Sequence, residues 1–193
     1  AEFERSYKQY EKLPQPRIVA AKVHVDLYPE RGHMRAKGTY SLVNRNAVDV
    51  TELHLRIGES LTVHSLEPGL PGELISDDPR FRYQIYRLAA PMRPGEAATL
   101  RFDVGYEREG FGNDGRTTSI VDNGSFFNNA EMLPGIGYSR AYELEDDDRR
   151  KEQGLPLRER ALAIDDPEGL KNTYIASDAD WIDFEASVCT APD

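Results

Sequence analysis

Two segments near the start of the chain alternate apolar and polar residues with a period of two, and this pattern constrains the fold most strongly. Between residues 19 and 27, apolar side chains occupy every second position, with Lys22, His24 and Asp26 between them. Residues 34–42 repeat the pattern. Strict alternation gives an extended segment one apolar and one polar face, which is typical of half-buried antiparallel strands. A turn around Gly32 predicts that the two strands form a hairpin.

The rest of the chain continues mainly in short apolar runs. Further strands are predicted at 53–57, 61–63, 81–85, 100–106 and 182–188, with Pro-Gly and Asp-Pro turn signals between several of them. This spacing predicts antiparallel twisted sheets or a β-sandwich. The fold class is therefore mainly β. We expect a lead segment at 1–16, a single β-domain at 17–193 and short helices near 140–163.

The helices are predicted from charge order and stop signals. Acidic residues precede basic ones between residues 142 and 153, and Gly154 and Pro156 follow. This order complements the helix dipole and predicts a short, ion-paired surface helix that includes Asp148, Arg149 and Arg150. A second short helix is expected at 155–163.

Composition bears on the class of partner. With 39% hydrophobic and 30% charged residues, the chain has the composition of a globular protein. Its net charge of -10 repels phosphate backbones and anionic lipid surfaces. No apolar run approaches the length of a membrane span. We therefore expect no nucleic-acid partner and no direct membrane contact by this segment.

Cysteine and histidine usage gives no sequence signal of a metal site. Cys189 is the only cysteine, so it forms no intrachain disulfide, and its place in an alternating strand predicts a small core residue. No two histidines have the i, i+4 spacing of a zinc-binding helix. His24, His33, His54 and His64 are all expected to face solvent, and no metal ligand or catalytic residue is expected in this chain.

A dense block of turn-forming and recognition residues occupies positions 123–138. It joins the aromatic pair Phe126 and Phe127 to paired amides and the carboxylate of Glu131, and it closes with Pro134 and two glycines. Such turn chemistry predicts a loop of fixed shape, and a rigid loop can present polar groups for recognition. From the residues alone, a polar connection anchored by two buried phenylalanines is an alternative interpretation.

Segments along nearly the whole chain resemble a known family. They are YEKLPQPR at 10–17, VHVDLYP at 23–29, AKGTY at 36–40, the block at 123–138, YEL at 142–144 with DRR at 148–150, and DWIDFEA at 180–186. In order and spacing they resemble the N-terminal β-domain of aminopeptidase N-type (gluzincin) zinc metallopeptidases. The likeness is closest to a bacterial branch in which the peptidase region is joined to an ABC-type permease region. It implies a saddle-like β-domain that is a soluble segment of a membrane-attached bacterial parent.

The resemblance also implies roles for residues of the 123–138 block. In that family the β-domain sends a Gln-x-Glu loop to the catalytic domain, where it helps to bind the free N-terminus of the peptide. Asn129-Ala130-Glu131 occupies the similar position. Glu131 would be the amine-binding carboxylate, Asn129 its supporting amide and Phe127 part of the side-chain pocket. Asn replaces the longer Gln and the following proline is displaced to Pro134, so an exposed loop carboxylate is the alternative for Glu131.

The catalytic motifs of the family are missing from this chain. Neither His-Glu-x-x-His nor the amine-binding Gly-x-Met-Glu-Asn occurs, and in the family both would follow this region. The resemblance thus implies a non-catalytic domain, inactive alone, that shapes the substrate cleft. Its partners would be the catalytic domain of the same polypeptide and a peptide substrate, with zinc only in the parent protein. The alternatives are a stand-alone protein- or carbohydrate-binding β-sandwich with exposed Tyr and Trp181, and a scaffold whose parent has lost the zinc site.

Overall fold

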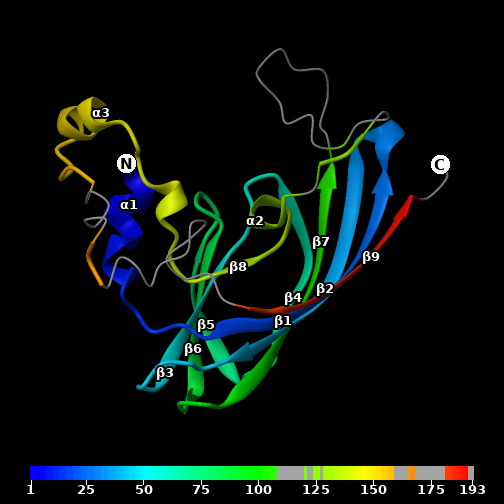
Figure 1. Ribbon diagram of the computed structural model, residues 1–193, viewed down its shortest axis with the longest axis horizontal. Coiled ribbons are helices and arrows are strands. Elements are labelled where there is room, and N and C mark those ends of the chain that lie inside the picture. Colours follow the sequence, from blue (N-terminus) through cyan, green and yellow to red (C-terminus); the bar gives the residue numbers. More distant parts are fainter. Residues whose placement is uncertain (108–119, 121–123, 127, 159–164, 168–180, 191–193) are drawn as a thin grey trace. The chain divides into compact units, whose positions relative to one another are not determined.

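The computed structural model describes residues 1–107, 120, 124–126, 128–158, 165–167 and 181–190 (Figure 1). The chain forms two compact units. Unit 1 holds residues 1–11 and 138–182, and unit 2 holds residues 12–137 and 183–193. The single β-domain at 17–193 and the lead segment at 1–16 stay predictions. Within the described ranges, no helix combines the length and apolar character needed to cross a membrane.

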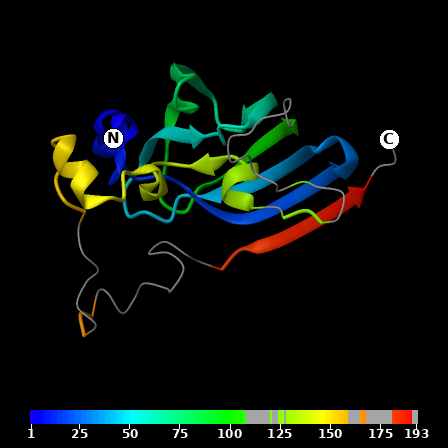
Figure 2. The same ribbon diagram turned by 90° about the horizontal axis from the view of Figure 1, so that it is seen from above.

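Unit 2 contains a five-stranded sheet, sheet A, whose strands lie in the order β4-β7-β2-β1-β9. The strands are β1 (Arg17–Tyr28), β2 (His33–Val43), β4 (Leu61–Pro68), β7 (Ala97–Glu107) and β9 (Asp183–Thr190). Neighbours are antiparallel except β1 and β9, which are parallel. Figures 1 and 2 both show β9 along the outer edge of the sheet beside β1.

The predicted hairpin is confirmed. Strands β1 and β2 pair from Arg17 opposite Val43 to Tyr28 opposite His33. The 3-10 turn η2 (Pro29–Arg31) connects them, and Gly32 closes the turn with a φ of 64°. This left-handed backbone favours glycine because a Cβ would crowd the following carbonyl.

A second sheet, sheet B, completes unit 2. Its antiparallel strands lie in the order β5-β6-β3-β8. They are β3 (Val50–Arg56), β5 (Gly72–Asp78), β6 (Tyr83–Met92) and β8 (Gly135–Ile136). One apolar cluster draws its buried side chains from both sheets, among them Val23, Leu42, Leu53, Leu55 and Val104. The predicted mainly β fold with two sheets is confirmed.

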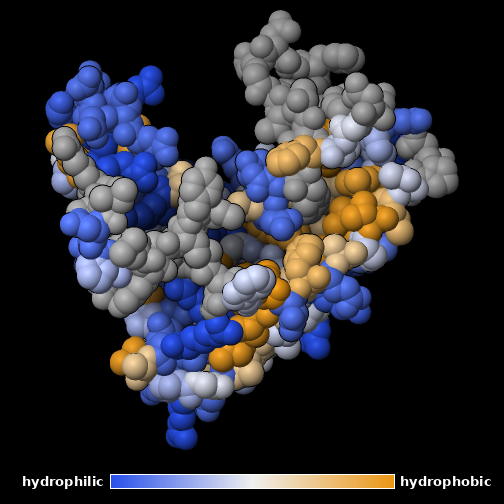
Figure 3. Space-filling model, in the orientation of Figure 1, coloured by the Kyte–Doolittle hydropathy of each residue, from blue (hydrophilic) through white to orange (hydrophobic). Residues whose placement is uncertain are grey.

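Part of the apolar surface of unit 2 is exposed. Figure 3 shows apolar residues gathered over the strands of sheet A on the face in view. On the edge strand β9, Phe184 and Val188 are 50% and 60% exposed. They pair with the buried residues Ala21 and Val25 of β1, so they continue the core face of the sheet to its edge.

Unit 1 is built from short helical elements. They are α1 (Glu2–Tyr7), η1 (Lys8–Tyr10), η3 (Arg140–Tyr142) and α3 (Asp147–Glu152). The helix predicted at 142–153 is therefore shorter, because Asp146 is its N-cap and accepts a hydrogen bond from the Arg149 amide at 2.8 Å. Residues 155–158 are not helical, which corrects the start of the second predicted helix. Gly154, with a φ of 65°, ends α3 before Pro156. The rest of that prediction, 159–163, lies outside the described residues.

Candidate functional site

Glu131 lies on a short helix whose first turn orients its carboxylate. The helix is α2 (Asn129–Met132), and Asn128 is its N-cap. The Asn128 Oδ1 accepts a hydrogen bond from the Ala130 amide at 3.0 Å, while its Nδ2 donates to Glu131 Oε1 at 3.0 Å. Glu131 is exposed. The loop therefore presents a carboxylate that is oriented by a neighbouring amide and can accept hydrogen bonds from a cation.

The structure places the other two predicted site residues differently. Asn129 is the first residue of α2 and is exposed, and its carbonyl accepts the hydrogen bond from the Leu133 amide at 3.1 Å. Phe127 lies outside the described residues, and its neighbour Phe126 is 73% exposed. The amide that contacts Glu131 belongs to Asn128, which sequence analysis did not single out. An Asn followed by Glu three positions later is a capping-box spacing, and that was the available signal.

The chain after Glu131 is anchored to the core of unit 2. Met132 and Leu133 are buried in the apolar cluster. The Tyr40 hydroxyl donates a hydrogen bond to the Pro134 carbonyl at 3.1 Å in buried surroundings. Next, β8 adds Gly135 and Ile136 to sheet B opposite Arg56 and Leu55. Residues 132–133, Pro134 and residues 135–136 thus contact the core, β2 of sheet A and β3 of sheet B in turn, and these contacts fix the position of α2.

Two glycines allow the loop backbone to approach its neighbours closely. At Gly58, which lies between β3 and β4, a Cβ would stand 2.1 Å from the Glu131 carbonyl oxygen. At Gly135 a Cβ would stand 2.6 Å from Arg56 Nη2, and the Arg56 Nε donates to the Gly137 carbonyl at 2.5 Å. At Gly58 the close atom is backbone, so only a residue without a side chain fits there. At Gly135 it is the end of the Arg56 side chain, which a Cβ would displace.

Behind β8, the edge of β3 is completed by a side chain. The Gln15 Nε2 donates to the Glu52 carbonyl and its Oε1 accepts from the His54 amide, each at 2.8 Å. The Gly137 amide donates to the His54 carbonyl at 2.9 Å. Buried backbone groups need partners, and the Gln15 amide provides them where β8 has ended.

His54 does not face solvent, which corrects the prediction. It is fully buried, its Nδ1 lies 3.0 Å from the Tyr83 hydroxyl and its Nε2 lies 3.4 Å from Glu52 Oε2. Burial lowers the pKa of His54, and the nearby Glu52 carboxylate opposes this effect only in part. An imidazole can be buried in a strand when both ring nitrogens have polar neighbours, so alternation alone does not settle which way it points.

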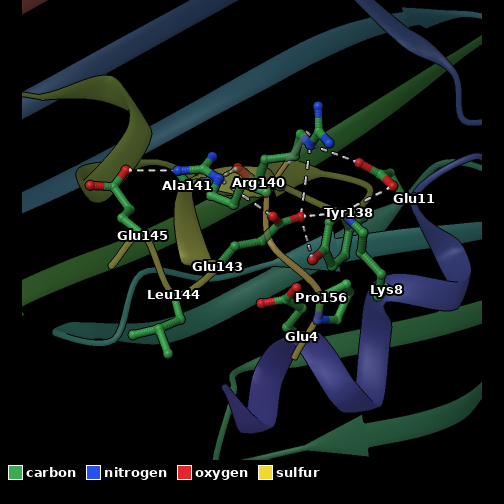
Figure 4. A network of polar contacts seen from close by, with 12 residues as sticks. Glu4, Lys8, Glu11, Tyr138, Arg140, Ala141, Glu143, Leu144, Glu145 and Pro156 are labelled. Carbon is green, nitrogen blue, oxygen red and sulfur yellow. Dashed lines mark hydrogen bonds and ion pairs between the residues drawn. The ribbon is translucent and has the colours of Figure 1, made fainter. Parts of the chain in front are cut away.

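Unit 1 contains a polar network centred on Glu143 (Figure 4). Lys8 Nζ donates to Glu143 Oε1 at 2.6 Å, and the Tyr138 hydroxyl donates to the same oxygen at 2.9 Å. Burial raises the pKa of Glu143, but the hydrogen bonds from Lys8 and Tyr138 outweigh it, so the pKa of this carboxyl is lowered. The Phe3 ring stacks on Tyr138 with centroids 5.4 Å apart. The network satisfies a buried carboxylate, which is a structural role.

Arg150 is buried, so α3 is not simply the ion-paired surface helix that was predicted. Its guanidinium and the Glu4 carboxylate are 2–3% exposed and form two hydrogen bonds, at 2.9 and 2.6 Å. The remaining donors reach the carbonyls of Leu144 at 2.6 Å and Pro156 at 2.7 Å. Asp148 and Lys151, by contrast, form an exposed pair at 3.0 Å, as expected of a solvated helix face.

Cys189 is exposed, so the prediction of a small core residue is wrong. It lies on the edge strand β9, whose eight residues are all exposed, and it pairs with Asp26 on the polar face of sheet A. Its side chain is close to His24 and Asp26 of β1. Among the described residues, these three are the one group of potential metal ligands that the fold brings together.

Comparisons with known proteins give structural neighbours only. No family model matches the sequence, and no match was found among curated proteins. The chain is similar to an M1 zinc metallopeptidase from Deinococcus radiodurans, with 16% identity and a TM-score of 0.37 over 49% of this chain and 21% of that chain. A two-domain M1 zinc metallopeptidase variant bound to L-tryptophan gives 16% identity and a TM-score of 0.41, over 62% and 29% of the two chains. Aminopeptidase A from Legionella pneumophila, in complex with aspartic acid, gives 18% and 0.35 over 50% and 11%. The matched region spans less than a third of each of these proteins.

Proposed function

We propose that this chain is the non-catalytic N-terminal β-domain of a zinc aminopeptidase-like protein, and that its Glu131 loop binds the free N-terminus of a peptide. In this proposal the domain shapes one side of the substrate cleft, while a catalytic domain of the same polypeptide holds the zinc. The link to an ABC-type permease region, and so to a membrane, belongs to the same proposal and rests on the sequence resemblance.

The observation that carries the proposal is the combination of an exposed, oriented carboxylate with an anchored backbone. Glu131 is exposed and contacts Asn128, whereas Met132 and Leu133 directly after it are buried. A loop that served only as a connection would need neither an oriented carboxylate nor a fixed backbone beside it. Recognition of a small cationic group does need both, because hydrogen bonds to a charged donor depend on distance and direction.

The chemistry required for an exopeptidase matches this arrangement. A peptide N-terminus is an ammonium group, and a blocked terminus carries neither the charge nor the full set of donors. A carboxylate that becomes enclosed when a second domain covers it favours the ammonium strongly over the blocked form. Asn128 would hold one Glu131 oxygen in place, which leaves the second oxygen directed to the substrate. Asn129 and Phe127 would have supporting roles at most.

The first test is to read the parent polypeptide beyond residue 193 for His-Glu-x-x-His. If that motif is present, the parent protein with Glu131→Gln should show a rise in KM of about tenfold or more for substrates with a free amine. Hydrolysis of an N-acetylated peptide should be unaffected or relatively favoured. The matched control is Glu73→Gln on β5, an exposed carboxylate elsewhere in unit 2, which should leave both constants unchanged.

Two results would overturn the proposal at different levels. Unchanged kinetics for Glu131→Gln in an active parent would remove the role of Glu131 but not the domain assignment. A parent without the zinc motif and without peptidase activity would favour the scaffold alternative. Binding of the isolated chain to a glycan or to a folded protein partner would favour the stand-alone module.

A further inference from the structure

The polar face of β1 and its neighbour β9 bring together three side chains that commonly bind metal ions. They are the imidazole of His24, the carboxylate of Asp26 and the thiol of Cys189. One potential ligand atom from each lies within 4.8 Å of the other two. This cluster lies on the surface of unit 2 and is unrelated to the Glu131 loop.

The topology of sheet A creates the cluster. His24 and Asp26 are two residues apart on one strand, so their side chains point to the same face. In the parallel pairing, Asp26 lies beside Cys189 and His24 beside Ser187. The pairing register therefore places a thiol next to a carboxylate across 163 residues of sequence, a juxtaposition that spacing along the chain could not indicate.

A fourth residue orients the imidazole. The Ser187 Oγ lies 2.8 Å from His24 Nδ1, and Asp26 Oδ1 lies 3.1 Å from His24 Nε2. A hydroxyl can donate or accept. In a neutral imidazole without a metal, Nε2–H donates to the Asp26 carboxylate, which can only accept, and the Ser187 hydroxyl donates to Nδ1. In the other tautomer the Ser187 hydroxyl accepts from Nδ1–H, and the lone pair of Nε2 can bind a cation that Asp26 Oδ1 also contacts. Histidine ligands of metals characteristically donate their second N–H to such a partner.

We propose that His24, Asp26 and Cys189 form a surface site for a zinc-like divalent cation, with Ser187 as the partner that orients His24. Imidazole nitrogen, thiolate sulfur and carboxylate oxygen are the zinc ligands of proteins. A thiolate and a carboxylate together neutralise the two charges of the ion. Ligand atoms around tetrahedral zinc are roughly 3.4–3.6 Å apart, so side chains that are now within 4.8 Å need only small rotations. Solvent water would complete the coordination.

The site would fasten β9 to the sheet. All eight residues of β9 are exposed, so the strand gains little from apolar burial, and its pairing with β1 holds it in place. A cation bound by two residues of β1 and one of β9 would crosslink the two strands. Binding to the folded state alone stabilises that state by mass action, and here the effect should concentrate at β9.

The test uses the chain without a histidine tag, kept reduced and titrated with Co²⁺ and then Zn²⁺. We expect one equivalent per chain, a thiolate-to-cobalt charge-transfer band and the visible bands of tetrahedral cobalt, which zinc then displaces. Because Cys189 is the only cysteine, a sulfur band can come from no other residue. Amide hydrogen exchange should slow in β9 on addition of zinc.

Variants separate the proposed ligands from incidental binding. Cys189→Ser should abolish the sulfur band, His24→Ala should weaken zinc binding strongly, and Ser187→Ala should weaken it about tenfold or more. His33→Ala on β2 is the matched control and should change neither. Folding of each variant is verified by far-UV circular dichroism, which substitutions at these exposed or half-buried positions should leave unchanged. Absence of the sulfur band, or half an equivalent of metal per chain from an ion shared between two molecules, would overturn the proposal.

Discussion

Replacing Gly58 by alanine should displace the Glu131 loop without touching the carboxylate. The new Cβ would stand 2.1 Å from the Glu131 carbonyl oxygen, and ordinary contact begins near 3.4 Å, so one of the two must retreat by about 1 Å. Neither side yields easily. The obstacle is backbone rather than a flexible side-chain end, Met132 and Leu133 behind it are buried, and the Tyr40 hydroxyl holds Pro134.

Overpacking of this kind costs about 1–3 kcal/mol of unfolding free energy. For a chain of this size that corresponds to a fall of roughly 2–12 °C in melting temperature. Urea and thermal unfolding measure the loss, and amide NMR shifts of residues 130–132 report movement of α2. In an active parent, misplacement of about 1 Å is enough to reduce turnover or affinity substantially.

The control is Glu59→Ala at the adjacent exposed position, which should change stability by less than about 0.5 kcal/mol. If Gly58→Ala proves as stable as the control and leaves the amide shifts of α2 unmoved, the loop is not seated against Gly58. The inference that its backbone holds Glu131 in a fixed position would then fail.

Two further predictions concern unit 1, and near-UV circular dichroism of its packed aromatic rings, among them Phe3 and Tyr138, can follow both. The folded pKa of Glu143 is lowered, so its contribution to stability is present above its ordinary pKa of 4.5 and is lost as pH falls through the lower folded value. Glu143→Gln should therefore make the free energy of unfolding depend less on pH on the acid side. An unchanged pH dependence would contradict this. Arg150→Met should cost about 3–5 kcal/mol because it leaves the Glu4 carboxylate buried without its cation. The double variant with Glu4→Leu should recover much of the loss, and no recovery would mean that the pair is not coupled.

Strand alternation was sufficient to predict the fold class, because sheet A buries one face and exposes the other. It failed where polar side chains are buried with specific partners. His54 and Arg150 are buried because Tyr83, Glu52 and Glu4 satisfy them. Tyr83 is 29 residues from His54 and Glu4 is 146 residues from Arg150, so alternation along one strand could not indicate these partners. Cys189 is exposed although a core residue was predicted, because it lies opposite Asp26 on the polar face of sheet A, whereas its neighbour Val188 lies on the core face.

The candidate site was predictable in part. The turn chemistry of the 123–138 block indicated a loop of fixed shape, and the described residues from 128 to 137 have that character. The contact between Asn128 and Glu131 was present in the sequence as a capping-box spacing. The close approach between Gly58 and the Glu131 carbonyl could not be predicted from the sequence, since it depends on how the turn after β3 meets α2 in three dimensions.

The parallel pairing of β1 with β9 also has a consequence for the order of folding. Ala20 and Asp183 are partners across 163 residues, whereas the antiparallel pairs of sheet A join segments closer in sequence. At 5–20 residues per second, a ribosome takes roughly ten to thirty seconds to supply β9 after β1 has emerged. During that interval the outer edge of β1 displays unpaired backbone groups that can recruit a strand from another molecule. A nascent chain arrested before residue 183 should therefore aggregate more readily than the completed one.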